Sequence, residues 1–128
     1  MTSLLLALAF FGQQYNCLSE NVYYEARNQP FIGQVAVADV TLNRVNSNRW
    51  PDTPCAVVKQ RKQFSWTLEE HEKPTGKAWK TAQKAVLVSL LGPDRTKGAT
   101  HFHATYVTPY WAAKQKVIVT IGDHIFYV

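Results

Sequence analysis

The segment that most constrains the fold is residues 33–46, GQVAVADVTLNRVN, which is apolar on nearly every side when read as a helix. Only Asp39, Asn43 and Asn46 interrupt it, and their spacing puts them in one polar stripe. A helix with so little polar surface must be covered by other elements, because exposing it to water is costly. We therefore expect this helix at the centre of one small domain.

Helical patterns come first along the chain and strand patterns come last. Besides the central segment, helices are expected at residues 16–27, with Asn16 as N-cap, and at 75–91. Two β-rich runs, 116–121 and 124–128, are joined by a Gly-Asp pair typical of a two-residue hairpin. This order predicts an α+β domain that is helical first, with a small antiparallel β-sheet toward the C-terminus.

With 128 residues the chain fits a single domain, and no stretch resembles a linker between two. Residues 1–15 are expected to form an apolar helix that ends in a short break at 12–15, or to be the remnant of an export signal. The apolar run is too short to cross a bilayer, so we expect no stable membrane insertion. Residues 16–128 would hold the core of the domain.

The chain has a net charge of +5 and a pI of about 9.3. These values favour an anionic partner and leave a nucleic acid, a membrane surface and a cell-wall polymer open. No run matches a nucleic-acid-binding motif, so we expect no nucleic acid partner.

Two cysteines, Cys17 and Cys55, are too few for a zinc site. They could form one disulfide outside a reducing compartment, or serve as two small buried hydrophobes, and their spacing leaves both open. Cys17 opens the helix at 16–27, and Cys55 opens a short helix capped by Thr53 with Pro54 at its first position. We therefore expect the two cysteines to lie close together.

Glu25 stands out because it shares a helix face with Leu18 and Val22, where an ionised carboxylate is costly unless it is paired or functional. It also falls in the last turn, near the negative end of the helix dipole. Burial and the dipole both raise the pKa of a carboxyl group, as a general acid near neutral pH requires. On spacing alone, a structural pairing with Arg27 or Arg44 is the simpler interpretation.

Other kinds of site find little support. His101 and His103 fall in a short predicted strand at 100–104, and we expect them to point to opposite faces and not to chelate one ion together. No HExxH-like spacing, Gly-flanked serine or phosphate-binding glycine loop is present, so we expect no metal and no cofactor. Four tryptophans and six tyrosines suit a sugar-binding cleft, but they suit a packed core equally well.

Several blocks occur in a fixed order along the chain: EAR at 25–27, NRV at 43–45, QFSW at 63–66, FHA at 102–104 and IGDHIFY at 121–127. In these blocks residues 17–128 resemble the cell-wall hydrolase family of the spore-cortex-lytic enzymes, which includes bacterial wall enzymes and phage endolysins. The resemblance implies a lysozyme- and lytic-transglycosylase-like domain, so that residues 1–128 form one catalytic domain with the hydrolase part at 16–128.

The resemblance also implies cleavage of the β-1,4 bond between N-acetylmuramic acid and N-acetylglucosamine in peptidoglycan. The family's EAR glutamate maps onto Glu25, which reverses the structural interpretation given above. Glycosidases normally use two carboxylates, and Asp39 is the only other acidic residue in a helix expected to pack near Glu25. A lytic transglycosylase with one catalytic glutamate therefore fits best. The alternative is a hydrolytic muramidase, ahead of a stem-peptide amidase or a non-catalytic peptidoglycan-binding module.

The chain departs from the family motif at Asn28 and Gln29, where many relatives carry Gly and Glu. Asn tolerates left-handed backbone angles, so Asn28 is expected to end the helix in that conformation. The remaining substrate-binding residues are expected in polar-aromatic segments outside the helices and in the polar stripe. They are Gln63, Phe64, Ser65, Trp66, His103, Tyr106 and Asn43.

We expect a monomer that binds the glycan strands of peptidoglycan and acts on the bacterial cell wall, in the periplasm or outside the cell. Its small size and basic charge suit a phage-encoded lysin released to the wall at lysis.

Overall fold

The computed structural model describes residues 2–60 and 73–128. Four of the expected site residues, Gln63, Phe64, Ser65 and Trp66, therefore lie outside the described residues.

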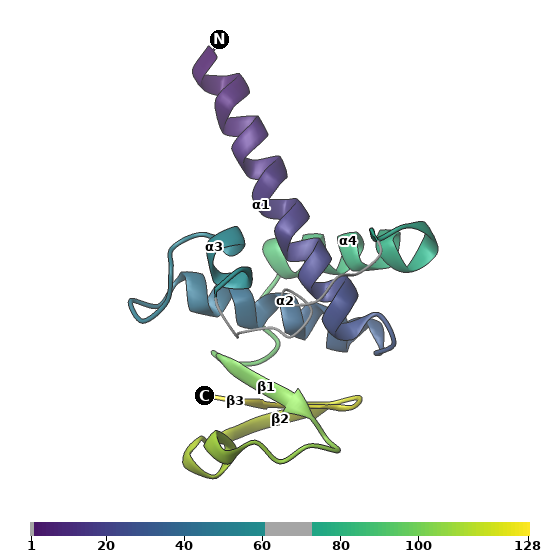
Figure 1. The fold of residues 1–128 in the computed structure, drawn as a ribbon, viewed down its shortest axis with the longest axis vertical. Helices are drawn as coiled ribbons and strands as arrows, with labels where there is room; N and C mark the ends of the chain where they lie inside the picture. Colours follow the sequence, from purple (N-terminus) through teal and green to yellow (C-terminus); the bar gives the residue numbers. More distant parts are fainter. Residues whose placement is uncertain (1, 61–72) are drawn as a thin grey trace.

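The described residues form helices followed by a small sheet (Figure 1). In chain order the elements are α1 (Thr2–Ala26), α2 (Phe31–Val45), α3 (Pro54–Val58), α4 (Gly76–Leu91), β1 (His101–Ala104), η2 (Tyr110–Lys114), β2 (Val117–Ile121) and β3 (His124–Tyr127). This order confirms the predicted α+β class.

The first helix differs from the prediction, because α1 is one continuous helix of 25 residues without a break at 12–15. A single glycine in an exposed helix costs only about 1 kcal/mol relative to alanine, so Gly12 does not end the helix. Asn16 does not act as a cap either. Its amide donates a hydrogen bond to Glu20, one turn further along the same helix, at 3.0 Å.

The N-terminal part of α1 projects from the rest of the domain as an apolar arm, residues 3–11 (Figure 1). Every residue of the arm is exposed, and side chains such as Leu6 keep as much as 68% of their surface in contact with solvent. Within the described residues, no helix has the length and apolar character that crossing a membrane requires.

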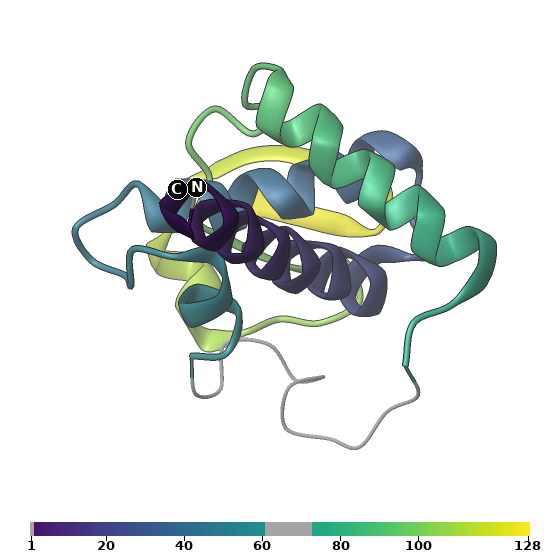
Figure 2. The same ribbon diagram turned by 90° about the horizontal axis from the view of Figure 1, so that it is seen from above.

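As expected, α2 forms the centre of the core. Its Val35, Val37 and Val40 are fully buried, together with Val86 of α4 and Phe126 of β3. Viewed from above, α1 and α4 lie over α2, with the sheet beyond it (Figure 2). The central helix is therefore covered by helices on one side and by the sheet on the other.

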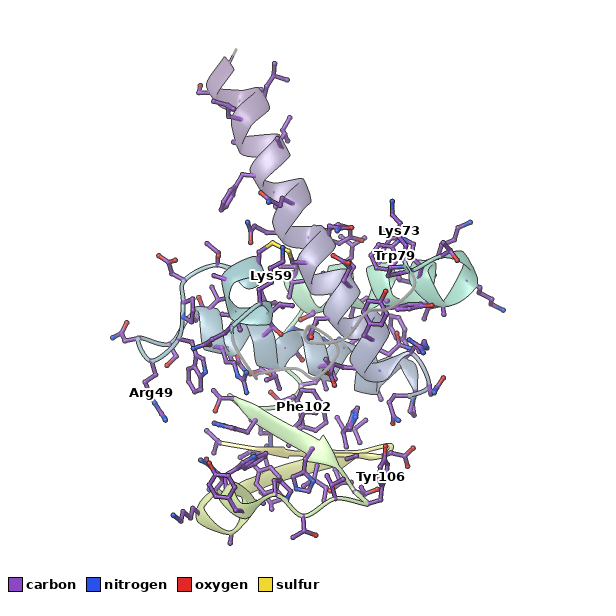
Figure 3. The ribbon with its side chains drawn as sticks, in the orientation of Figure 1. Arg49, Lys59, Lys73, Trp79, Phe102 and Tyr106 are labelled. Atoms are coloured by element: carbon purple, nitrogen blue, oxygen red, sulfur yellow. A yellow bond between two sulfur atoms is a disulfide. The ribbon has the colours of Figure 1, made fainter. Side chains whose placement is uncertain are left out.

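The three strands form an antiparallel sheet in the order β1-β3-β2. Gly122 opens the turn between β2 and β3 with a φ of +57°, as the predicted hairpin requires. The register pairs Phe102 with Phe126 and Ala104 with His124, so these four side chains share the face that meets the helices. Figure 3 shows Phe102 between the sheet and α2.

Cys17 and Cys55 form a disulfide with 5.1 Å between their Cα atoms, which confirms that they lie close together. The bond joins the middle of α1 to the start of α3. The cap of α3 is also as predicted, because the hydroxyl of Thr53 accepts a hydrogen bond from the backbone N–H of Ala56 at 3.2 Å and Pro54 follows it.

Candidate active site

Glu25 is the second-last residue of α1 and lines a polar pocket of about 210 Å³, here called the Glu25 pocket. Three parts of the chain form its walls: the end of α1 with the turn after it, the end of β1 with the segment after it, and the turn that leads into β3. The lining residues are Tyr24, Glu25, Arg27, Asn28, Gln29, Ala104, Tyr106, Asp123 and His124.

Burial raises the pKa of Glu25 from 4.5 to about 7. Its position in the last turn of α1 acts in the same direction, because the carboxylate would face the negative end of the helix dipole. A carboxyl group with this pKa is partly protonated at neutral pH, and it can donate a proton and later accept one.

The structural pairing of Glu25 is not found within residues 2–60 and 73–128, where its carboxyl group makes no hydrogen bond or salt bridge. The guanidinium of Arg27 instead lies 4.8 Å from the centre of the Tyr23 ring. Arg44 donates from Nε to the carbonyl oxygen of Thr100 at 2.7 Å. Both arginines are thus engaged elsewhere, and the carboxyl group of Glu25 faces the pocket.

The turn after α1 differs from the prediction in one respect. Among the described residues other than glycine, only Lys97 has a positive φ, so Asn28 does not adopt the left-handed conformation. Instead, the backbone N–H of Gln29 donates to the carbonyl of Ala26 at 2.9 Å. This bond turns the chain toward Pro30 and the start of α2.

Tyr106 lines the Glu25 pocket and is 83% exposed, so its ring is accessible to a ligand (Figure 3). Tyr106 follows the end of β1 by two residues, and the end of β1 lies next to the turn before β3. This arrangement places Tyr106 beside Glu25. The role of Tyr106 in substrate binding stays a prediction.

His103 is placed differently from our expectation, because it lies on the face of the sheet that points away from the helices. Its Nε2 atom is 2.7 Å from the hydroxyl of Tyr127, and its ring packs against Trp111 with 5.5 Å between the centres. His101 also packs against Trp111, at 5.1 Å. The expectation that His101 and His103 point to opposite faces was wrong, since residues two apart on a strand share a face.

Asn43 does not line the Glu25 pocket. Its amide donates hydrogen bonds to Asp94 and to the carbonyl oxygen of Ala99, both at 2.9 Å. It therefore ties α2 to the loop after α4. Asp39 lies in the same polar stripe and binds Ser89 and the backbone of Arg95, so it does not supply a second carboxylate to the pocket.

Sequence reasoning missed Asp123 and His124, which both line the pocket. Asp123 brings a second carboxylate to it. His124 is buried, and burial lowers the pKa of its imidazole, which favours the neutral form. Within the part of the chain that the structure describes, its Nδ1 atom has no hydrogen-bond partner. Both residues lie in the IGDHIFY block, but no local pattern indicates where a hairpin turn packs.

No group of three or more His, Cys, Asp or Glu side chains in the described ranges is arranged to hold a metal ion.

Comparisons with known proteins agree with the resemblance seen in the sequence. The sequence model of the Cell Wall Hydrolase family matches residues 28–127, a match that begins just after Glu25. A spore cortex-lytic enzyme of Halalkalibacterium halodurans is 39% identical over 110 residues, which cover 85% of this chain and 33% of that enzyme. A spore cortex-lytic enzyme of Bacillus cereus is 37% identical, over 85% of this chain and 42% of that enzyme. The chain thus spans less than half the length of either relative.

Two solved structures resemble the fold over most of its length. One is the catalytic domain of the germination-specific lytic transglycosylase SleB from Bacillus anthracis, with a TM-score of 0.77 and 33% identity over 90% of this chain and 93% of that one. The other is the catalytic domain of the SleB protein of Bacillus cereus, with a TM-score of 0.74 and 35% identity over 91% of each chain. The similarity therefore extends over more than 90% of each of these two catalytic domains.

Proposed function

The chain belongs to the cell wall hydrolase family, and we propose that it is a lytic transglycosylase of peptidoglycan with Glu25 as its general acid and base. The bond cleaved is the β-1,4 linkage between N-acetylmuramic acid and N-acetylglucosamine. The observation that carries this proposal is the carboxyl group of Glu25, whose pKa is raised to about 7 in a polar pocket at the end of α1.

In the first step the protonated carboxyl of Glu25 donates its proton to the glycosidic oxygen, and the bond from that oxygen to C1 of the muramic residue breaks. In the second step the Glu25 carboxylate takes the proton from the C6 hydroxyl of the same residue. The C6 oxygen then bonds to C1 and closes a 1,6-anhydro ring. Glu25 ends protonated as it began, and no water is consumed.

Asp123 favours a second candidate, a hydrolytic muramidase. A second carboxylate in the pocket could activate a water molecule that attacks C1 in place of the C6 hydroxyl. The two reactions cleave the same bond and differ only in the product, because hydrolysis leaves a reducing end and no anhydro ring.

The substrate in this proposal is the glycan strand of a bacterial wall, bound by a monomer. The similar proteins described above are bacterial enzymes and give no support to a phage origin. The net charge of +5 suits an anionic wall polymer.

Mass spectrometry of the fragments released from purified peptidoglycan tests the proposal. A lytic transglycosylase releases muropeptides that end in 1,6-anhydro-muramic acid and are lighter by one water molecule than the products of hydrolysis. Products with reducing ends would instead indicate a hydrolytic muramidase. Free stem peptides would indicate an amidase, and bound but intact walls a binding module.

A further inference from the structure

Gln29 connects the end of α1 to the start of α2. Its backbone N–H donates to the carbonyl of Ala26 at 2.9 Å, and its own carbonyl accepts a hydrogen bond from the amide of Gln34 at 3.2 Å. The backbone of Gln29 is thus fixed to both helices, four residues after Glu25.

The side chain of Gln29 makes two hydrogen bonds to one residue that is 94 positions away. Its Oε1 atom accepts from the backbone N–H of Asp123 at 2.8 Å, and its Nε2 atom donates to the Asp123 carboxylate at 3.3 Å. A primary amide offers an acceptor and a donor side by side, whereas a carboxylate offers acceptors only. The pair of bonds therefore requires an amide at position 29 while position 123 is an aspartate.

The turn before β3 packs closely on this segment. A Cβ atom added to Gly122 would lie 2.5 Å from Oε1 of Gln29 and 2.8 Å from Cδ of Pro30, which is closer than such atoms can approach. On its other side, the carbonyl of Asp123 accepts a hydrogen bond from the backbone N–H of Thr105 at 2.8 Å. Asp123 thus contacts both the turn after α1 and the segment that carries Tyr106.

We propose that Gln29 is a positioning residue of the active site, which holds the Asp123 turn against the end of α1 and thereby sets the distance between Glu25 and the opposite wall of the pocket. The proposal rests on the function proposed above. Gln29, Asp123 and Thr105 form one chain of hydrogen bonds through the three walls that surround Glu25. A small displacement of one wall changes the orientation of bound substrate, to which catalysis is sensitive.

The proposal can be tested by exchanging the amide and the carboxylate between positions 29 and 123. Gln29→Glu places a second carboxylate against that of Asp123 and removes the Nε2 donor, so the two side chains repel each other. Asp123→Asn removes the negative charge and leaves two amides that can still pair. In the double variant the introduced glutamate can accept hydrogen bonds from the backbone N–H and from the introduced amide at position 123, which restores both bonds with donor and acceptor exchanged.

The experiment measures kcat/KM on purified peptidoglycan at about 0.15 M salt, where the screening length is roughly 8 Å, for the wild type, the two single variants and the double variant. Gln29→Glu should lower kcat/KM about tenfold or more, since a hydrogen bond to a charged group is lost. The double variant should recover to within about threefold of the wild type, so that the two changes are strongly non-additive. Gln13→Glu is the matched control, because it adds the same charge at an exposed position of α1 that is roughly 18 Å along the helix from Glu25.

The alkaline limb of the pH–rate profile gives a second readout that a purely structural role would not move. Each added negative charge near Glu25 favours its protonated form. The alkaline limb should therefore move to higher pH for Gln29→Glu and to lower pH for Asp123→Asn. It should return close to the wild-type position in the double variant, whose total charge is unchanged. Gln13→Glu should leave it in place, since charges so far apart are screened.

Three results would overturn the proposal: wild-type kcat/KM in Gln29→Glu, additive losses in the double variant, or losses fully explained by a lower melting temperature. The products of the wild type are analysed in the same samples. Absence of anhydro ends would contradict the proposed reaction while leaving the coupling between Gln29 and Asp123 measurable, so the two failures can be told apart.

Discussion

The hydroxyl of Ser89 on α4 donates a hydrogen bond of 2.5 Å to the carboxylate of Asp39 on α2, in the interior of the helical part of the domain. Both side chains are buried, and burial is the main reason why the pKa of Asp39 is raised. The other oxygen of Asp39 accepts from the backbone N–H of Arg95 at 2.9 Å. Asp39 is therefore part of the packing between α2 and α4 and lies outside the Glu25 pocket.

Ser89→Ala should lower the free energy of unfolding by about 1–3 kcal/mol, because it leaves a buried carboxylate oxygen without its donor. Urea denaturation measures the change. Thr81→Ala on the same helix is the control, since among the described residues the Thr81 hydroxyl bonds only to the carbonyl of Lys77 one turn before it. The control should change the free energy by no more than about 0.5 kcal/mol. Equal effects of the two substitutions would contradict the role given to Asp39.

The disulfide between Cys17 and Cys55 closes a loop with a sequence separation of 38. In the chain-entropy model a loop of this size stabilises the folded state by about 3–4 kcal/mol. The Cys17→Ala/Cys55→Ala double variant should therefore unfold at a lower urea concentration than the oxidised wild type. Reductant should shift the wild type toward the variant and leave the variant unchanged. Coincident unfolding curves for the oxidised and reduced wild type would refute this prediction.

Gly122 and Gly76 form a matched pair, because both have a positive φ, of +57° and +78°. Alanine at either position should cost about 1–2 kcal/mol of backbone strain. Only Gly122 has neighbours that an added Cβ would strike, namely Gln29 and Pro30. Gly122→Ala should therefore destabilise the fold by about 1 kcal/mol more than Gly76→Ala and should also reduce activity. If both variants keep full activity, the close packing of the turn has no bearing on the Glu25 pocket.

The raised pKa of Glu25 predicts a pH dependence of stability. The folded state has a pKa of about 7 where an ordinary glutamate has 4.5, so folding disfavours the ionised form. The contribution of Glu25 to stability is then fully present below about pH 4.5 and declines as the pH rises to about 7, by about 2–3 kcal/mol after allowance for partial exposure. Glu25→Gln lacks this decline and should be the more stable protein above pH 7. Parallel stability curves for the two proteins between pH 4 and 8 would contradict the raised pKa of the Glu25 carboxyl group.

Much of the fold could be predicted from the sequence because its signals are local. Pro54 after Thr53 marked the start of α3, and Gly122-Asp123 between two β-rich runs marked the hairpin. The sequence does not reveal the continuous α1 because Gly12 suggests a break, although one glycine costs a helix little when its neighbours favour it.

The site was predicted only in part, since its assembly depends on contacts between distant residues. Glu25 came from its position at the end of a helix and from the family motif. The position of Asp123 in the pocket depends on a contact with Gln29 across 94 positions, which no periodicity reports. His103 was assigned to the groove from its segment alone, and pairing with β3 places it on the other face of the sheet.

The most direct test of the account is the rate at which Glu25→Gln lyses purified peptidoglycan at neutral pH. Glutamine keeps the shape of the side chain and removes the proton that the glycosidic oxygen needs. General acid–base catalysis contributes about 10²–10⁴-fold, so the rate should fall at least that far while the variant stays folded. A folded Glu25→Gln variant that lyses peptidoglycan at close to the wild-type rate would contradict the assignment of Glu25 as the catalytic acid.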